Sequence, residues 1–217
     1  MSHFITLVFT RDEDDLEDIM EPYCEEKEVE KYVEYTKEEA IASVREDLED
    51  YKNSIWYQEY IKNPEVYKEK NKDNPGHIDY LENEFPKRLK WTDEECYAYK
   101  ADLYDDDMKD EKGNLYSDYN PLSKWDWYEV GGRWRKWLRT KEGNVDEAYV
   151  SEVLWNEFDS VPFAFIDLNG DWHERGSMGW WAIVSDEKEK DAWQKEFEDY
   201  ISELDDDVKV LVIDCHI

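Results

Sequence analysis

The chain has 217 residues and a formal net charge of −31 at pH 7. Such an acidic surface repels nucleic acid, because polyanion binding depends on clustered Lys and Arg, so the composition excludes direct nucleic-acid binding. Aromatic residues make up 16% of the chain, which provides a core and argues against the disorder that 39% charged residues would otherwise indicate.

The cellular setting follows from hydropathy and cysteine usage. No stretch approaches the roughly 18 apolar residues of a membrane span, so we expect no membrane association. The three cysteines (Cys24, Cys96 and Cys215) are far apart and odd in number. This spacing predicts neither a disulfide framework nor a CxxC metal site. We therefore expect a reduced, cytoplasmic setting.

The patterns at both ends of the chain predict buried strands. SHFITLVFT near the start and VKVLVIDCHI at the end are apolar on both faces and rich in β-branched residues. We expect residues 2–10 and 208–216 to form adjacent antiparallel strands in the interior of one sheet.

Between these strands, residues 11–120 are expected to form an acidic, mostly helical insertion within a single α+β domain spanning residues 1–217. Residues 11–60 alone hold 19 acidic and 6 basic side chains. Two capping boxes, Thr36 with Glu39 and Thr92 with Glu95, mark the starts of helices.

Strands dominate the rest of the chain. WDWYEV (125–130) and SMGWWAIVS (177–185) are candidate strands, and the Asn169–Gly170 pair between extended runs predicts a hairpin. Asp186 with Glu189 is expected to cap a last helix before the C-terminal strand. The element order predicts an α+β fold with a ferredoxin-like core, in which helices cover one face of a mainly antiparallel sheet.

Three stretches together resemble a family of uncharacterised proteins of tailed bacteriophages. They are WDWYEVGGRW (125–134), HERGSMGWWAIVSDEK (173–188) and VIDCHI (212–217), supported by His3 and Phe4. The resemblance covers about half of the chain and is strongest from residue 121 onward. It implies a phage origin and the cytoplasm of the infected host cell, and it brings no established activity.

A binding site for a small anion is expected around residues 121–140, which carry five basic and two acidic side chains. Tryptophan and tyrosine rings can stack on a base, arginines can hold phosphates, and Gly131–Gly132 would let backbone amides approach an anion. Arg133 and Arg135 are expected on one strand face. The candidate ligand-binding residues are Trp125, Trp127, Tyr128, Gly131, Gly132, Arg133, Trp134, Arg135, His173 and Arg175. The alternative is structural: Trp125, Trp127 and Glu129 share one strand face, the glycines form a bulge, and the indoles fill the core.

Two histidines and an aspartate are the candidate catalytic residues. Antiparallel pairing of the terminal strands places His3 near His216, and the period of two puts Asp214 on the same face. Such a cluster can act as an acid/base pair or ligate a metal, with His173 as a third nitrogen. The alternative is a pair of satisfied histidines at a sheet end. Cys215 points to the opposite face and is expected in the core.

Three functions follow from these features. The first is a phage counter-defence protein that binds and sequesters a small anionic ligand such as a nucleotide signal. The second is an acidic DNA mimic that inhibits a nucleic-acid-binding host defence protein. The third is a nucleotide hydrolase. No stretch matches a P-loop, a dinucleotide fingerprint, a zinc motif or a nucleophile elbow, so the sequence indicates no particular cofactor or oligomeric state.

Overall fold

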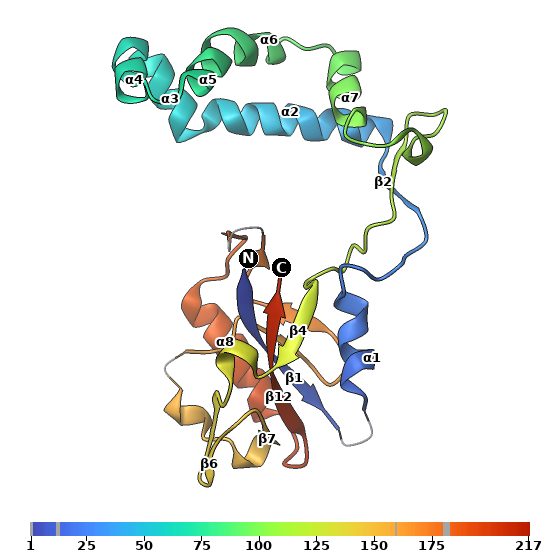
Figure 1. The fold of residues 1–217 in the computed structure, drawn as a ribbon, viewed down its shortest axis with the longest axis vertical. Helices are drawn as coiled ribbons and strands as arrows, with labels where there is room; N and C mark the ends of the chain where they lie inside the picture. The colour runs from blue at the N-terminus through green and yellow to red at the C-terminus, as the bar shows by residue number, and fades with distance from the viewer. Residues whose placement is uncertain (1, 12–13, 159, 180–182) are drawn as a thin grey trace. The chain divides into compact units, whose positions relative to one another are not determined.

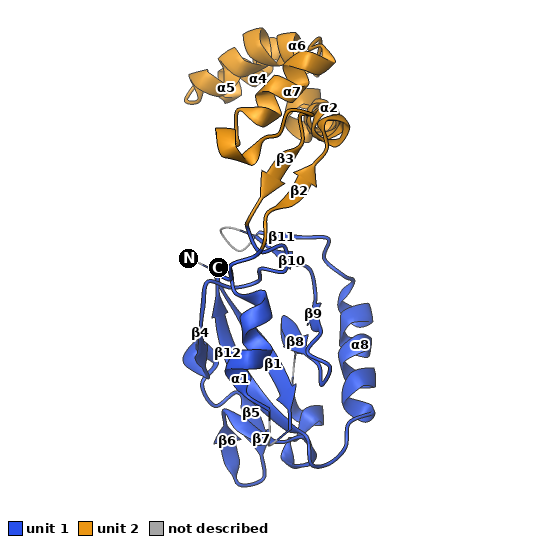
Figure 2. Cartoon of the chain, turned by 90° about the vertical axis from the view of Figure 1, so that its right-hand side faces the viewer, with its two compact units in different colours: residues 1–29, 119–217 blue, residues 30–118 orange. Residues whose placement is uncertain are grey.

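The computed structural model describes residues 2–11, 14–158, 160–179 and 183–217. The chain forms two compact units: unit 1 consists of Met1–Val29 and Tyr119–Ile217, and unit 2 consists of Glu30–Asp118 (Figure 2). Residues 14–29, which fall within the expected helical insertion, belong to unit 1 and carry its first helix.

Unit 1 combines a sheet with short helices and 3₁₀ turns. Its strands are β1 (His3–Thr10), β4 (Trp127–Val130), β5 (Leu138–Thr140), β6 (Gly143–Val145), β7 (Glu147–Tyr149), β8 (Ala164–Ile166), β9 (Trp172–Glu174), β10 (Ser177–Met178), β11 (Val184–Ser185) and β12 (Lys209–His216). Its helices are α1 (Leu16–Met20) and α8 (Lys190–Ser202), and its 3₁₀ turns are η1 (Glu21–Tyr23), η4 (Gly132–Trp134), η5 (Val150–Glu152) and η6 (Trp155–Glu157).

The two terminal strands form the centre of a six-stranded sheet in unit 1. β1 and β12 pair antiparallel along their whole length, from His3 opposite His216 to Thr10 opposite Lys209. Figure 1 shows the two strands side by side, with the termini at the same end of the sheet. Nearly all residues of both strands are buried, which explains their continuous apolar sequences. The predicted adjacency of the terminal strands is confirmed.

The sheet is mixed and mostly antiparallel. Its order is β4-β12-β1-β8-β9, with β7 also pairing with β12, and β8 runs parallel to β1. A ferredoxin-like sheet places a further strand between the two parallel strands of its split β-α-β unit, whereas here β8 lies directly beside β1. The α+β class is therefore confirmed, and the strand order does not confirm a ferredoxin-like core.

Helices cover both faces of this sheet. On one face, Phe197 of α8 packs against Phe9 and Phe165. On β9, His173 pairs with Phe165, so the neighbouring Trp172 points to the opposite face of the sheet. There Trp172 packs against Tyr23 of η1. The expectation that helices lie on one face is not confirmed, because the 3₁₀ turn η1 packs on the face opposite α8, and central strands that are apolar on both faces require cover on both.

Two local turn signals had different outcomes. The hairpin predicted around Asn169–Gly170 is confirmed as β8–β9, with Gly170 at a φ of +82° that favours glycine. The predicted cap Asp186 is wrong, because α8 begins at Lys190 with Glu189 in the N-cap position. Asp186 instead lies in the chain before the helix with a φ of +50°.

The segment 177–185 reverses direction rather than forming one strand. β10 and β11 pair with each other, with Ser177 opposite Ser185 and Met178 opposite Val184. Residues 180–182, which belong to the predicted strand and to the phage-like motif, lie outside the described residues. The prediction of one continuous strand over this segment is therefore wrong.

Unit 2 is largely helical. Its elements are β2 (Tyr32–Tyr35), α2 (Lys37–Asn53), α3 (Ile55–Lys62), α4 (Pro64–Lys70), α5 (Pro75–Asp79), the π-helical turn η2 (Tyr80–Glu84), α6 (Phe85–Arg88), α7 (Asp93–Ala101), the 3₁₀ turn η3 (Asp106–Met108) and β3 (Leu115–Ser117). Both predicted capping boxes are present, with Thr36 and Glu39 at the start of α2 and Thr92 and Glu95 at the start of α7. Among the described residues, no helix combines the length and apolar character needed to cross a membrane.

Candidate functional site

The paired ends of β1 and β12 bring His3, Asp214 and His216 together. His3 Nδ1 lies 2.8 Å from Asp214 Oδ1, and the rings of the two histidines are 4.8 Å apart between centroids. His3 and Asp214 expose only 7% and 2% of their side chains, so this pair is shielded from solvent. The register of the two strands produces the cluster that the sequence pattern predicts.

His216 forms a second imidazole–carboxylate pair, with Asp126. Its Nδ1 lies 2.6 Å from Asp126 Oδ1, and the backbone N–H of Asp126 donates to the carbonyl of His216 at 3.0 Å. Because the carboxylate accepts from Nδ1, the neutral ring carries its free lone pair on Nε2. That Nε2 is buried and has no hydrogen-bond partner among the described residues. Sequence reasoning missed Asp126, although it is one of only two acidic residues between 121 and 140.

Trp127 covers the histidine pair. Its ring stacks on His216 with a centroid distance of 5.1 Å and an interplanar angle of 17°, and it meets His3 edge-on at 5.3 Å. Strand pairing sets this contact, since Trp127 lies directly opposite His216 in β4. The residue remains 44% exposed, so part of Trp127 contacts the imidazoles and another part faces solvent.

The glycine pair after β4 accommodates carboxylates of the chain itself. A Cβ on Gly132, which has a φ of +43°, would lie 2.4 Å from Asp214 Oδ2, and a Cβ on Gly131 would lie 2.8 Å from the Asp146 carboxyl carbon. The N–H of Arg133 donates to Asp214 Oδ2 at 2.8 Å. The anion that approaches this amide is therefore the Asp214 carboxylate, which uses one oxygen for the loop and the other for a histidine.

Arg133 and Arg135 extend from a turn and not from a strand. Residues 132–134 form η4, so the expectation that both arginines share a strand face is wrong. Both side chains are exposed, and neither has a carboxylate partner within the part of the chain that the structure describes. The turn arises because Gly131 and Gly132 adopt positive φ angles, which end the strand at Val130.

Of the remaining rings in this stretch, Trp125 belongs to the core. Its side chain is 7% exposed and meets Tyr128 edge-on with centroids 4.9 Å apart. Tyr128 points away from Trp127, so the expectation that Trp125 and Trp127 share a strand face is wrong; the chain bends at Asp126 between them. Trp134 is half-buried and packs against the same core.

His173 and Arg175 have partners of their own. His173 stacks on Phe165 at 4.5 Å and lies 3.3 Å from Asp167 Oδ2, while Arg175 pairs with Glu187 at 2.9 Å. No described contact joins either side chain to the His3 and His216 pair or to the turn at 132–134. The structure thus does not bring these two residues to the candidate site.

Metal and thiol chemistry receive no support at this site. Within the described residues, no group of three His, Cys, Asp or Glu side chains is arranged to hold a metal ion. Cys215 is fully buried, and desolvation raises the pKa of its thiol to about 12, which keeps it protonated. Its position on the opposite face from His216 agrees with the expected core role.

The site therefore consists of a buried imidazole–carboxylate pair (His3–Asp214), a second pair whose carboxylate is partly exposed (His216–Asp126), a half-exposed indole over them and two exposed arginines on the adjoining turn. Comparisons of the chain with protein-family models, with curated proteins and with solved structures gave no match.

Proposed function

We propose that unit 1 binds a small anionic, nucleotide-like ligand at the end of the sheet formed by β4, β12 and β1. The exposed part of Trp127 provides a surface on which a base can stack. Arg133 and Arg135 provide guanidinium groups for phosphate oxygens. In the setting implied by the resemblance to phage proteins, such binding would sequester a host nucleotide signal and act against a defence pathway.

The observation that carries this proposal is that the exposed side chain of Arg133 has no carboxylate partner among the described residues. The chain holds 58 acidic and 27 basic residues, so an exposed guanidinium has many carboxylates available to it. The backbone of Arg133 is fixed by Asp214, yet its side chain has no carboxylate partner in the described structure. An exposed guanidinium without a carboxylate partner and an exposed indole, both within ten residues of one stretch of chain, suit an anionic aromatic ligand.

The overall charge adds selectivity for small ligands. A net charge of −31 repels a long polyanion over the whole surface, whereas a mononucleotide meets only the local field of residues 121–140. His216 adds an acceptor, because its Nε2 has no hydrogen-bond partner among the described residues and could accept from a ligand donor.

A thermal-shift titration against mono-, di- and cyclic nucleotides tests this proposal. We expect one class to stabilise the wild type and Arg133→Ala to weaken its binding about ten- to a hundredfold, the value of a charge-assisted contact. Lys141→Ala is the matched control, because it also removes one exposed positive charge but leaves the turn at 132–134 intact. Equal losses in both variants, or stabilisation by no nucleotide, would refute a defined pocket.

The two imidazole–carboxylate pairs favour a second candidate, hydrolysis of the bound nucleotide. A carboxylate that holds Nδ1 orients Nε2 as a general base, as His216 and Asp126 would. His216→Gln should then abolish turnover while leaving nucleotide binding within a few-fold. Binding without any detectable hydrolysis by the wild type would leave sequestration as the function.

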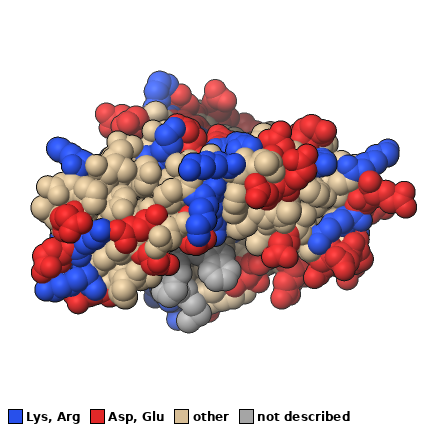
Figure 3. Space-filling model, turned by 90° about the horizontal axis from the view of Figure 1, so that it is seen from above, with Lys and Arg blue, Asp and Glu red and all other residues tan. Residues whose placement is uncertain are grey.

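The DNA-mimic hypothesis makes a different demand on the surface. It requires carboxylates in rows across one contiguous face, with partner binding that weakens steeply as salt rises. On the face drawn in Figure 3, basic side chains are interspersed among the acidic ones. On this face, the distribution does not match the rows of carboxylates that a mimic requires. Capture of a nucleic-acid-binding host protein at low but not high salt would support the mimic instead.

A further inference from the structure

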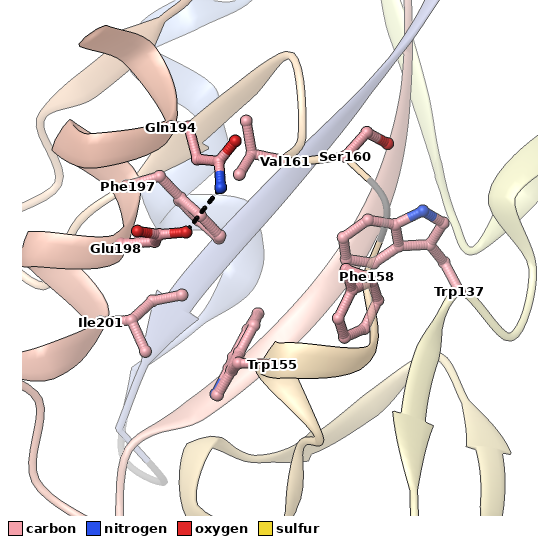
Figure 4. A pocket seen from close by; sticks show the side chains of 9 residues that line it. All are labelled: Trp137, Trp155, Phe158, Ser160, Val161, Gln194, Phe197, Glu198 and Ile201. Atoms are coloured by element: carbon pink, nitrogen blue, oxygen red, sulfur yellow. Dashed lines mark hydrogen bonds between the residues drawn. The ribbon is translucent and has the colours of Figure 1, made fainter. Parts of the chain in front are cut away.

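A small cavity lies in unit 1 between helix α8 and the chain around η6 (Figure 4). Its volume is about 60 Å³, and its lining includes Trp137, Trp155 and Phe158 on one side. Phe197 and Glu198 of α8 lie on the other side (Figure 4). None of these residues belongs to the proposed nucleotide site.

The aromatic side chains are held in place by one another. Trp137 and Phe158 are 4.3 Å apart between ring centroids, Trp155 and Phe158 are 5.9 Å apart, and Trp155 and Phe197 are 5.8 Å apart. The indole N–H of Trp155 donates to the carbonyl of Val150 at 3.0 Å. The polar edge of that indole is thus satisfied within the protein, and its apolar surface is available to the cavity.

Glu198, an exposed residue of α8, is the one charged side chain among the described residues that line the cavity. Its carboxylate accepts from the Gln194 amide at 2.8 Å, and the described lining residues include no Lys or Arg. The surroundings already accommodate a cation against an aromatic ring, because the Arg139 guanidinium lies 5.4 Å from the centroid of Phe158. Aromatic walls beside a carboxylate attract cations and repel anions.

We propose that this cavity binds a quaternary ammonium group. Such a group is cationic, has no hydrogen to donate and presents methyl groups to its surroundings, so aromatic rings with one nearby carboxylate recognise it well. The volume fits this size, since about 60 Å³ has room for about four or five water-sized groups, and a whole nucleotide is excluded.

Titration of the whole protein with choline, followed by tryptophan fluorescence and calorimetry, tests this assignment. Its neutral isostere 3,3-dimethyl-1-butanol has the same shape without the charge. We expect choline to bind roughly tenfold more tightly than the isostere, because the isostere gains no cation–π attraction. Equal affinity for the two compounds, or binding of neither, overturns the proposal.

Substitutions on and near helix α8 test whether choline binds in this cavity. Glu198→Gln should weaken choline binding several-fold, whereas Glu203→Gln removes an exposed carboxylate near the end of the same helix and should leave it unchanged. Trp155→Leu should abolish binding, and circular dichroism will show whether it folds. Equal effects of the two glutamate variants would indicate general electrostatic attraction and overturn the assignment.

A peptide containing trimethyl-lysine, compared with the same peptide containing unmodified lysine, identifies the source of the group. Tighter binding of the trimethylated peptide than of choline indicates a modified protein as the natural ligand. Tighter binding of choline indicates a free small molecule. Preference for unmodified lysine would contradict the quaternary-ammonium assignment.

Discussion

The two arginines of unit 2 and two exposed arginines of unit 1 are used in different ways. In unit 2 both arginines are held by the protein itself: Arg45 donates to the Trp91 carbonyl and to Asp93, and Arg88 lies over three rings. In unit 1, Arg133 and Arg135 are exposed and have no carboxylate partner among the described residues.

This difference distinguishes arginines that stabilise the fold from arginines whose guanidinium groups are available to bind a ligand. The Arg88 guanidinium lies 5.1–5.3 Å from the centroids of Tyr80, Trp91 and Tyr99 and so connects the chain around α6 with α7. Nothing in the described fold depends in this way on the Arg133 guanidinium. Ligand binding by guanidinium groups is therefore expected from unit 1, and the following predictions test the contrast.

The largest expected effect comes from the separate cores of the two units. Phe165 is 1% exposed and contacts five rings in unit 1, so Phe165→Ala should cost about 3–5 kcal/mol. Phe85 is its counterpart in unit 2, buried against three tyrosines. In denaturant unfolding, each substitution should shift a different transition. A single unfolding transition that shifts equally in the two variants would show that both units unfold as one cooperative unit and would contradict this prediction.

The next effect concerns the turn that positions Arg133. Gly132→Ala should cost about 1–3 kcal/mol, because its Cβ would collide with Asp214 at a positive φ. Gly170→Ala is the control, since that glycine also has a positive φ but nothing lies within 4 Å of its added Cβ. A cost no greater than that of the control would show that the loop can move away from Asp214, and that Arg133 is not held by it.

A smaller effect compares the two kinds of arginine directly. Arg88→Ala should destabilise unit 2 by about 1–2 kcal/mol through the loss of cation–π contacts. Arg133→Ala should change stability by less than about 0.5 kcal/mol, as expected for an exposed side chain without partners. Thermal and denaturant unfolding of both variants measure the difference, and a large loss of stability from Arg133→Ala would make it a structural residue.

The smallest effect is a pH dependence within unit 1. Burial opposes ionisation of Asp167, but hydrogen bonds from the backbone N–H groups of Asp171 and Asn169 outweigh it and lower the pKa of this carboxyl. A lowered folded pKa stabilises the fold above about pH 4 and loses this contribution as pH falls through the folded value. Asp167→Asn should therefore flatten the acid limb of stability by about 1 kcal/mol. An unchanged acid limb would contradict this role.

The centre of the fold could be predicted from the sequence because its signals are local. Continuous apolar runs mark β1 and β12, and the register of two antiparallel ends brings His3 and His216 together. Capping boxes at Thr36 and Thr92 work within four residues, so no distant part of the chain has to be known.

The rest of the site depends on contacts that no local pattern contains. Asp126 reaches His216 because the chain bends before β4, and Asp214 lies within hydrogen-bonding distance of the turn because two glycines end that strand. The two-sided apolar pattern of β1 implied that other elements pack on both faces of the sheet. The sequence does not show that η1, which is far from α8 along the chain, packs on the second face. Interactions between segments distant in sequence decided these points.

Because residues near the two ends of the chain pair with each other, the candidate site can be followed with a fluorescent label. Ser2 and Ile217 exchange two backbone hydrogen bonds, of 3.2 and 3.1 Å, directly beyond the pair formed by His3 and His216. A fluorophore attached after Ile217 would therefore lie near the indole of Trp127, opposite His216 in the sheet, and its quenching would report the binding of a ligand. The same proximity allows the ends to be ligated by a short peptide and the chain to be reopened at the exposed turn around Gly143, giving a permuted protein with its site free of tags.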